Sequence, residues 1–549
     1  MKLKITGWMA CCMLLAACGP GKEDQPESSD NKTIFRYNEI STVSSLDPAA
    51  ANKLENIWVV NQLFNGLVQL NDELKVVPCI AKSWEIYDDQ LEYTFHLRGD
   101  VFFHDHEQFE GGKGRRVTAH DFVYSFTRLS EMKEEQSSKY LLGMLERTNG
   151  VGVTAPNDST LKIFLSKPFP PFLEVLTMQY FSVVPREIVA HYGEEFRRNP
   201  VGTGPFKFRT WTDEKLVLVR NENYFETEGN ERLPYLDGVA VSFIKDKETG
   251  FTEFLKGNFD MISGMETMNK DVVLTREGGL QEAYKDKIVM QKSPFLKTDY
   301  LGFFLDKNLR KESENPLMKK EVRQAISYAI DRQKIVSYLR YSVGVPATAG
   351  FIPPGLPSFD KTKVTGYDYD PEKAKELLKK AGFPDGKGLP EITLNITSQF
   401  FEISEAIREQ LRQAGISVKI NVNPTEMQTD MIEKGQFDFF RKSWVGDYAD
   451  AQNFFSIFYS KNFSPNGPNY FHFSNEQFDK LYELAMKEEN TEDRYGIYYA
   501  MDQIIMDEAV VIPVFYDEVL RLVQKNVEGL STNAMNLLNL KRVKIARRG

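Results

Sequence analysis

The chain of 549 residues is predicted to be a mixed α/β protein, because strand-like and helix-like periods alternate along it. In residues 91–98 apolar and polar side chains alternate, which is typical of a strand with one buried face. His96 would then lie on the solvent side. Residues 391–422 read as strand, helix and strand, and this order predicts a parallel pair with a right-handed crossover.

Capping residues and glycines mark the predicted helix ends. Asp370-Pro371-Glu372 supplies an N-cap, a proline at the first helical position and an acid near the positive end of the helix dipole, and Gly382 ends this helix. Helix 402–414 of the crossover unit ends at Gly415. Asn315-Pro316 likewise predicts a helix start. The apolar positions of that helix share one face and are Val322, Ala325, Ile326, Ala329 and Ile330.

The amino terminus has the layout of a secretory leader. Two lysines precede an apolar run, residues 5–14, that is too short to span a bilayer. The next four residues, Leu15-Ala16-Ala17-Cys18, resemble the lipobox of bacterial lipoproteins. We therefore expect a signal peptide over residues 1–17, a lipid on Cys18 and a polar tether over residues 18–32, with the protein at the cell envelope.

Composition excludes several classes of protein. Cys11 and Cys12 would leave with the leader and Cys18 would carry the lipid, so Cys79 alone cannot build a disulfide scaffold or a cysteine metal site. Lys and Arg number 68 against 78 Asp and Glu, a net charge of −10 that becomes −12 when the two leader lysines are removed. So acidic a chain is a poor partner for nucleic acid.

The sequence lacks the common catalytic motifs HExxH, GxSxG and the phosphate loop. Gly202-Thr203-Gly204 runs into Pro205 and predicts a tight turn, not a dinucleotide site. His104-Asp105-His106 carries groups that can bind a metal, but beside a glycine-rich loop it is more typical of a solvated turn. We therefore expect no enzymatic activity, no cofactor and no metal site.

Short motifs stand in a fixed order along nearly the whole mature chain. They are residues 45–48, 63–68, 77–78, 81–84, 93–98, 117–126, 202–206, 221–225, 322–326, 329–332 and 446–450. Each motif is weak, but the ordered series resembles the peptide- and nickel-binding family of solute-binding proteins that serve ATP-driven importers. The chain departs from the family pattern at residues 103–117, where a longer basic loop replaces a short turn.

The resemblance implies a periplasmic-binding-protein type II (cluster C) fold, in which a hinge joins two lobes and one lobe carries an extra small domain. Lobe I would comprise residues 33–70, 200–293 and 517–549, the extra domain residues 71–199, and lobe II residues 294–516. The chain would then cross between the lobes twice. In such proteins the lobes close on the ligand, so function is a population shift and no bond is made or broken.

Similar peptide-binding members hold the α-amine of the ligand with an aspartate in the segment that here reads WVGDY, residues 444–448. The resemblance therefore implies Asp447 for this role. An ammonium group enclosed in a dry cleft needs a charged acceptor, which agrees with the assignment. The alternative is a loop aspartate that bonds to its own backbone after Gly446.

Sequence-tolerant peptide binding also needs main-chain pairing along exposed backbone edges. By resemblance these edges are Ser443 and Val445 on lobe II, and Asn52, Lys53 and Leu54 on lobe I. Arg441 and Trp444 are sequence neighbours of Ser443 and Val445. Arg441 stands where oligopeptide-binding members can carry an arginine that meets a ligand carboxylate, and the alternative is a solvated arginine at a strand end. Trp444 would form part of the core or of the pocket wall.

The resemblance thus predicts a lipid-anchored, monomeric peptide-binding component of an ATP-binding-cassette importer that delivers peptides to permease subunits. Two alternatives stay open. The same scaffold could bind another solute, such as a nickel chelate or haem, and His472 is the nearest candidate ligand for these. It could also serve as a surface receptor or adhesin.

Overall fold

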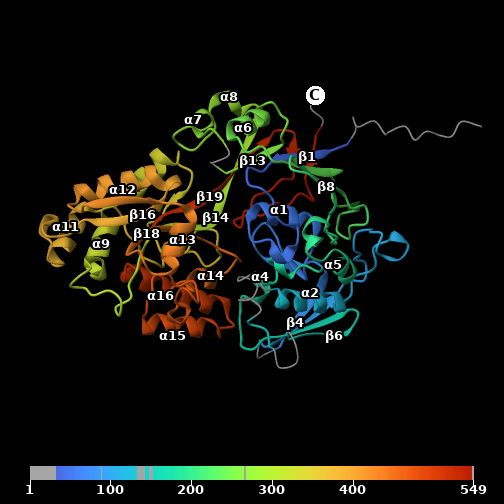
Figure 1. The fold of residues 1–549 in the computed structure, drawn as a ribbon, viewed down its shortest axis with the longest axis horizontal. Coiled ribbons are helices and arrows are strands. Elements are labelled where there is room, and N and C mark those ends of the chain that lie inside the picture. The colour runs from blue at the N-terminus through green and yellow to red at the C-terminus, as the bar shows by residue number, and fades with distance from the viewer. Residues whose placement is uncertain (1–31, 88–89, 133–142, 147–151, 265–267, 547–549) are drawn as a thin grey trace, which may run out of the picture. The chain divides into compact units, whose positions relative to one another are not determined.

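The computed structural model describes residues 32–546 except 88–89, 133–142, 147–151 and 265–267 (Figure 1). The predicted signal peptide, Cys18 and nearly all of the tether lie outside the described residues. From Thr33 onward the chain forms one compact unit. Within the described ranges, no helix combines the length and the apolar character that crossing a membrane requires.

A sheet of eleven strands runs through the described part of the chain. Its order is β17-β16-β18-β14-β19-β13-β1-β12-β9-β8, and β15 pairs with β19 beside this path. The eleven strands are β1 (Ile34–Asn38), β8 (Phe206–Trp211), β9 (Lys215–Arg220), β12 (Gly238–Ser242), β13 (Met261–Ser263), β14 (Ile288–Phe303), β15 (Val345–Pro346), β16 (Ile392–Thr397), β17 (Val418–Asn423), β18 (Phe439–Val445) and β19 (Val511–Gln524).

Strands β14 and β19 connect the two halves of this sheet. They are antiparallel neighbours over almost their whole length, with an irregularity between Pro294 and Thr298 of β14. Near its end β14 also pairs with β18, whereas β19 pairs near its end with β13 (Figure 1). Buried apolar side chains form two large clusters, one drawn mostly from residues 35–241 and the other mostly from residues 296–515. Two long strands that cross between two cores are the arrangement that a hinge requires.

A second sheet has the order β4-β5-β7-β6, and α2 packs on its strands β6 and β7. Its strands are β4 (Ala81–Ile86), β5 (Glu92–Leu97), β6 (Val153–Asn157) and β7 (Thr160–Phe164). Three pairs of short strands complete the described β-structure, namely β2 (Val68–Leu70) with β3 (Val76–Pro78), β10 (Thr227–Glu228) with β11 (Glu231–Arg232), and β20 (Val527–Glu528) with β21 (Lys544–Ile545).

The helices lie on the faces and at the ends of these sheets (Figure 1). They are α1 (Leu54–Leu63), α2 (Ala119–Glu131), α4 (Phe172–Val175), α5 (Arg186–Tyr192), α6 (Lys247–Leu255), α7 (Lys270–Val273), α8 (Glu282–Lys285), α9 (Lys320–Tyr328), α10 (Arg332–Lys334), α11 (Pro371–Lys380), α12 (Phe401–Gln413), α13 (Thr425–Glu433), α14 (Gln452–Phe455), α15 (Glu476–Ala485) and α16 (Thr491–Asp507).

Several local predictions are confirmed. Residues 91–98 contain β5, and the His96 side chain is 35% exposed and meets Glu85 at 3.3 Å. Strands β16 and β17 are parallel with α12 between them, which is the predicted crossover unit. At the start of α11 the Asp370 side chain accepts a hydrogen bond from the backbone N–H of Lys373 at 2.9 Å.

One helix start was predicted too early. Asn315 accepts a hydrogen bond from the backbone N–H of Leu317, but it caps only a short 3-10 turn, Pro316–Met318. Lys319 has an extended backbone, which separates this turn from the following helix, so α9 begins at Lys320. The apolar face predicted for this helix is nevertheless buried, because all five of the predicted residues are buried.

The solvated turn predicted for residues 104–106 is wrong for His104, which is buried. Its Nδ1 accepts from the backbone N–H of Gly202 at 3.3 Å, and its Nε2–H donates to the carbonyl of Gly204 at 3.0 Å. Burial lowers the pKa of His104 to about 4, so the ring is neutral. His104 therefore holds the predicted Gly202-Thr203-Gly204 turn.

Candidate ligand-binding site

Strand β18 has one paired edge and one open edge. On one side it pairs with β14, with Ser443 opposite Asp299. On its other side β18 meets β16 only where Phe440 lies opposite Asn395. Among the described residues no strand pairs with the β18 segment that follows Phe440 on that side. The last five residues of β18 therefore present a free sheet edge.

The hydrogen bonds around β18 show which main-chain groups face the open edge. The backbone N–H of Gly446 donates to the carbonyl of Leu296 at 2.8 Å, so Gly446 points toward β14. The carbonyl of Arg441 points away from β14, where Gln428 Nε2 lies 3.5 Å from it. Because the direction alternates along an antiparallel strand, Ser443 and Val445 point away from β14 with Arg441. These are the two residues of β18 that the sequence analysis assigned to main-chain pairing.

The loop after β18 presents the Asp447 carboxylate to solvent. Asn453, at the second position of α14, donates from Nδ2 to Asp447 Oδ2 at 3.2 Å and accepts from the Asp447 backbone N–H at 3.2 Å. Trp444 Nε1 donates to the same Asn453 Oδ1 at 2.9 Å. Within the described residues Asp447 forms no ion pair, and its Oδ1 has no hydrogen-bond donor.

The pKa of Asp447 is raised, and burial among protein atoms is the largest cause. The hydrogen bond from Asn453 acts in the opposite direction. A water molecule can still reach the carboxylate, so Asp447 lies in a recess that is open to solvent yet surrounded by protein. A cation placed beside such a carboxylate would stabilise its charged form, because it would replace the hydration that the carboxylate has lost.

Arg441 is turned into the protein. Its guanidinium forms an ion pair with Asp299 and lies against the ring of Phe400, and its side chain is largely buried. Burial lowers the pKa of Arg441. The alternative that Arg441 is a solvated strand-end residue is therefore wrong, whereas its predicted contact with a ligand carboxylate stays a prediction. Trp444 packs partly buried against the second apolar cluster, as expected of a residue in the core or pocket wall.

A cavity of about 830 Å³ opens beside the two long strands. Cavities of this volume can bury a small peptide. Of the eight residues predicted to bind ligand, Leu54 is the one that lines it. Asn52 and Lys53 precede α1 and are exposed, and Lys53 has an extended backbone. The other lining residues include Phe295, Lys297, Arg340, Phe400, Asp517 and Glu518.

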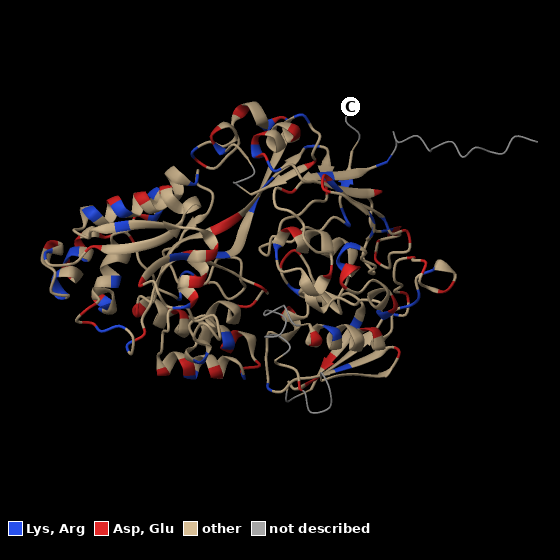
Figure 2. Cartoon of the chain, in the orientation of Figure 1, with Lys and Arg blue, Asp and Glu red and all other residues tan. Residues whose placement is uncertain are grey.

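The sequence analysis missed a group of charged side chains on β14 and β19. Lys297 Nζ lies 2.8 Å from Asp517 Oδ2 and 3.5 Å from Asp299 Oδ2, and Arg340 also pairs with Asp517. Burial alone would raise the pKa of Asp517, but the two cations outweigh it and the pKa is lowered. Figure 2 shows acidic and basic stretches side by side on the two strands. Charges within an otherwise apolar strand were the available sequence signal.

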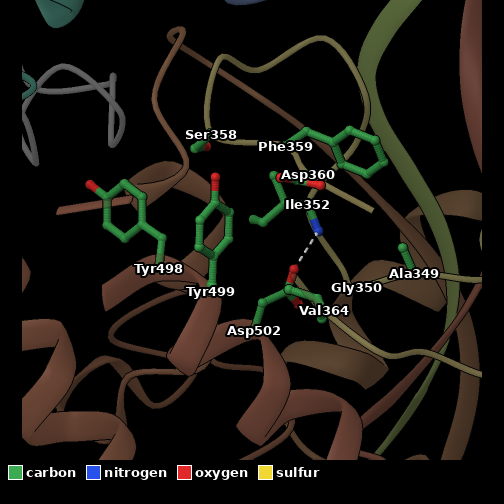
Figure 3. A pocket seen from close by; sticks show the side chains of 10 residues that line it. All are labelled: Ala349, Gly350, Ile352, Ser358, Phe359, Asp360, Val364, Tyr498, Tyr499 and Asp502. Atoms are coloured by element: carbon green, nitrogen blue, oxygen red, sulfur yellow. Dashed lines mark hydrogen bonds between the residues drawn. The ribbon is translucent and has the colours of Figure 1, made fainter. Parts of the chain in front are cut away.

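A second cavity illustrates a buried acid with a structural role (Figure 3). Its volume is about 10 Å³, which is room for a single water molecule at most. Asp502 of α16 accepts from the backbone N–H groups of Phe351 at 2.7 Å and Ile352 at 3.3 Å. Burial raises the pKa of Asp502 to about 7. Asp502 therefore fixes the loop at residues 349–352, and this cavity is too small for a ligand.

The histidines do not assemble a metal site in the described part of the chain, where no three His, Cys, Asp or Glu side chains group around a common point. His106 Nε2 contacts the Tyr192 hydroxyl at 3.1 Å, while His104 bonds to backbone. His472 pairs with Asp306 at 2.9 Å, and its other ring nitrogen lies 3.0 Å from the carbonyl of Ser464. All three rings thus have protein partners.

A mixed α/β fold with two cores, two crossing strands and an open strand edge suits a protein that binds a ligand between two lobes. Residues 75–466 match the family described as bacterial extracellular solute-binding proteins, family 5, and the chain belongs to this family. Its members are non-catalytic, and they act outside the cytoplasm. Both the family resemblance and the expected absence of catalysis are thereby confirmed.

Three relatives place the chain within this family. The dipeptide-binding protein of Escherichia coli is 26% identical over 502 residues, covering 88% of this chain and 89% of its own length. Heme-binding protein A of Haemophilus influenzae is 28% identical, covering 94% of each chain. The solved structure of the ABC transporter-associated periplasmic binding protein DppA from Helicobacter pylori, in complex with peptide STSA, aligns with a TM-score of 0.75 at 26% identity. That alignment covers 94% of this chain and 98% of the other. The predicted cluster C fold is confirmed.

Proposed function

We propose that this protein is the peptide-binding component of an ATP-binding-cassette importer, held at the cell envelope by a lipid on Cys18. One observation carries the proposal. An exposed Asp447 carboxylate, without a cation among the described residues, directly follows the open main-chain edge of Ser443 and Val445. The E. coli relative is named for dipeptide binding, and the H. pylori structure contains a peptide, which supports a peptide ligand here.

In this proposal the ammonium group of the ligand pairs with Asp447. A free peptide amine carries the charge that the recess lacks, and charge-assisted hydrogen bonds are the strong kind. The ligand backbone then adds to β18 as an extra strand, at Ser443 and Val445. Main-chain pairing tolerates any side chain, which suits a protein that takes up varied peptides.

The lobes would close on the ligand about β14 and β19. In this proposal lobe I comprises residues 33–70, 200–293 and 517–549, the extra domain residues 71–199 and lobe II residues 294–516. Asn52, Lys53 and Leu54 would then meet the ligand from lobe I. A ligand carboxylate that reached Arg441 would compete with Asp299 for the guanidinium, so Arg441 would contribute less than Asp447.

Haem is the main alternative ligand, because one relative is named for binding it. Its iron would need a histidine or similar donor in the cleft. Both ring nitrogens of His472 already have protein partners, Asp306 and Ser464. This arrangement favours a peptide.

Replacing Asp447 by asparagine tests the proposal. The substitution keeps the shape and removes the charge, and removing one partner of a buried charge pair costs roughly 2 to 5 kcal/mol. We expect the affinity for tri-alanine to fall about 30-fold to several thousandfold. N-acetyl-tri-alanine should bind weakly to both proteins, because it lacks the ammonium group. Isothermal calorimetry measures all four combinations.

Asp385→Asn is the matched control, since it removes the same charge from an exposed turn elsewhere. It should bind tri-alanine like the wild type. If the acetylated peptide binds the wild type as tightly as the free peptide, Asp447 does not hold the amine and the peptide assignment fails.

The lipid is tested separately. Cys18→Ser should leave an unprocessed precursor, because lipoprotein processing requires the cysteine thiol at the predicted cleavage site. Immunoblotting and metabolic labelling with a fatty acid follow the two forms. Normal cleavage of Cys18→Ser, with release of the product, would show that Cys18 carries no lipid.

A further inference from the structure

Asn453 joins three groups of the proposed ligand site. Its side chain is 5% exposed, so it lies behind the site and not at its surface. Its Oδ1 accepts from Trp444 Nε1 at 2.9 Å and from the Asp447 backbone N–H at 3.2 Å, and its Nδ2 donates to Asp447 Oδ2 at 3.2 Å. The side chain thus connects β18, the site loop and α14.

The two neighbouring donors fix the orientation of the Asn453 amide. An indole N–H and a backbone N–H can only donate, so the amide atom that faces both of them must be the oxygen. The NH₂ group must then face the carboxylate of Asp447. This leaves Oδ2 of Asp447 bonded, while no described residue donates to Oδ1.

We propose that Asn453 is the positioning residue for the ligand amine: it holds Asp447 ionised, with Oδ1 directed to the incoming ammonium group. The inference rests on the proposed function, because it takes Asp447 as the amine acceptor. Asn453 contributes the only hydrogen bond to the Asp447 carboxylate within the described chain. A hydrogen bond donated to a carboxylate favours its charged form.

Few other groups act on this carboxylate. Tyr470 is the titratable side chain that interacts with it, and its phenol is neutral at physiological pH because burial raises its pKa to about 12. Trp444 contacts Asn453 but carries no charge. Burial of Asp447 opposes ionisation, and Asn453 counteracts that effect. Among the described side chains, Asn453 is therefore the one that favours the charged form of Asp447.

Asn453→Asp tests the role with almost no change of shape. The new carboxylate keeps an oxygen for Trp444 and for the Asp447 N–H, but replaces the donor with a second acid. Two carboxylates that share a site cannot both ionise easily, so the pH below which binding is lost should rise by about one unit or more. For a rise of one unit, the loss of tri-alanine affinity relative to the wild type should approach about tenfold at the acid end of the profile. Calorimetry from pH 4.5 to 8 measures the profile.

Asn308→Asp is the matched control, because it makes the same substitution on an exposed turn elsewhere. It leaves the hydrogen bonds of Asn453 in place. Its pH profile for tri-alanine should match that of the wild type. An Asn453→Asp profile that also matches the wild type would overturn the positioning role.

A second variant separates positioning from general stability. Asn453→Ala should weaken tri-alanine binding about tenfold in the wild-type background and hardly at all in Asp447→Asn, because its effect acts through Asp447. Equal losses in both backgrounds would indicate a purely structural role and overturn the inference. If wild-type protein binds free and acetylated tri-alanine equally, the proposed function has failed instead. The outcomes are therefore distinguishable.

Discussion

Asp447 and Asp502 show how two carboxylates without a cation serve different ends. Neither forms an ion pair within the described residues, and burial raises the pKa of both. Asp502 accepts hydrogen bonds from two backbone N–H groups and is closed off from solvent. Asp447 has one oxygen without a protein partner and is open to solvent. Accessibility, and not the pKa shift, distinguishes the candidate site from the structural acid.

Asp502 makes stability depend on pH. Its pKa rises from 3.8 to about 7 on folding, so its contribution is fully present below pH 3.8 and is lost as the pH rises through 7. Three pKa units correspond to roughly 4 kcal/mol. We expect the free energy of unfolding of the wild type, relative to Asp502→Asn, to fall by up to this amount between pH 4 and 7.5. Urea unfolding followed by circular dichroism measures it, and parallel curves would contradict the prediction.

At this scale the sequence predicted residues of the candidate site only where a family pattern marked them. Asp447 was assigned to the ligand amine because its motif resembles that of peptide-binding relatives, and this role stays a prediction. Asn453 could not be found, since an asparagine before two phenylalanines gives no local signal. The pairing of Arg441 with Asp299 depends on strands β14 and β18, which are far apart in the chain. Such long-range pairs follow from sheet register, which local patterns do not determine.

The turn at residues 202–204 shows how one element constrains another. The backbone N–H of Gly204 donates to the carbonyl of Leu63 at 2.8 Å, at the end of α1. A Cβ added at Gly202 would lie 2.1 Å from the same carbonyl oxygen. His104 holds the turn from its other side. The sequence predicted a tight turn but not that it packs against the end of α1.

Gly202→Ala should destabilise the protein by about 1–3 kcal/mol, because the new methyl group has no room and the backbone must shift. Gly496→Ala is the control. Gly496 lies within α16, where an added Cβ meets no atom within 4 Å, so alanine should stabilise the helix by about 0.5–1 kcal/mol. Thermal unfolding of both variants measures the two effects. A stable Gly202→Ala would mean that α1 and the turn are less closely packed.

Elements with strong local signals were predicted well, and their junctions less well. The crossover unit of β16, α12 and β17 has caps, glycine stops and clear periods. At Asn315 the capping residue and proline were read correctly as a start, but the extended backbone of Lys319 splits the segment. A lysine at this position gives no sequence signal for that break, and helix ends are the part of a helix that is hardest to place.

At the scale of the whole molecule, the cluster C fold followed from the order of many weak motifs. The contacts between the predicted lobes did not. Phe169, in the predicted extra domain, meets Tyr448, in predicted lobe II, with ring centroids 6.5 Å apart. Leu74 of the β2–β3 hairpin belongs to the second apolar cluster, although it precedes that cluster's other residues by far in the chain. Tertiary contacts of this kind leave no periodic pattern in the sequence.

Ligand binding should make the molecule more compact, because the proposal has the lobes close about β14 and β19. Small-angle X-ray scattering should give a smaller radius of gyration with saturating tri-alanine. Asp447→Asn at the same concentration should show no change, and neither should the wild type with N-acetyl-tri-alanine. An unchanged radius for the wild type, at a concentration where calorimetry shows full binding, would exclude closure.

The contacts of α1 also bear on the order in which the chain can fold. Trp58 Nε1 donates to the carbonyl of Asn536 at 2.7 Å, and Gln62 Nε2 donates to the carbonyl of Leu538 at 2.8 Å. Strand β13 likewise pairs with β19. A ribosome releases the amino-terminal segment first, at about 5–20 residues per second. Helix α1, which is synthesised early, therefore cannot make these contacts until the carboxyl-terminal segment emerges. A chain that ended before Asn536 would lack both partners of α1.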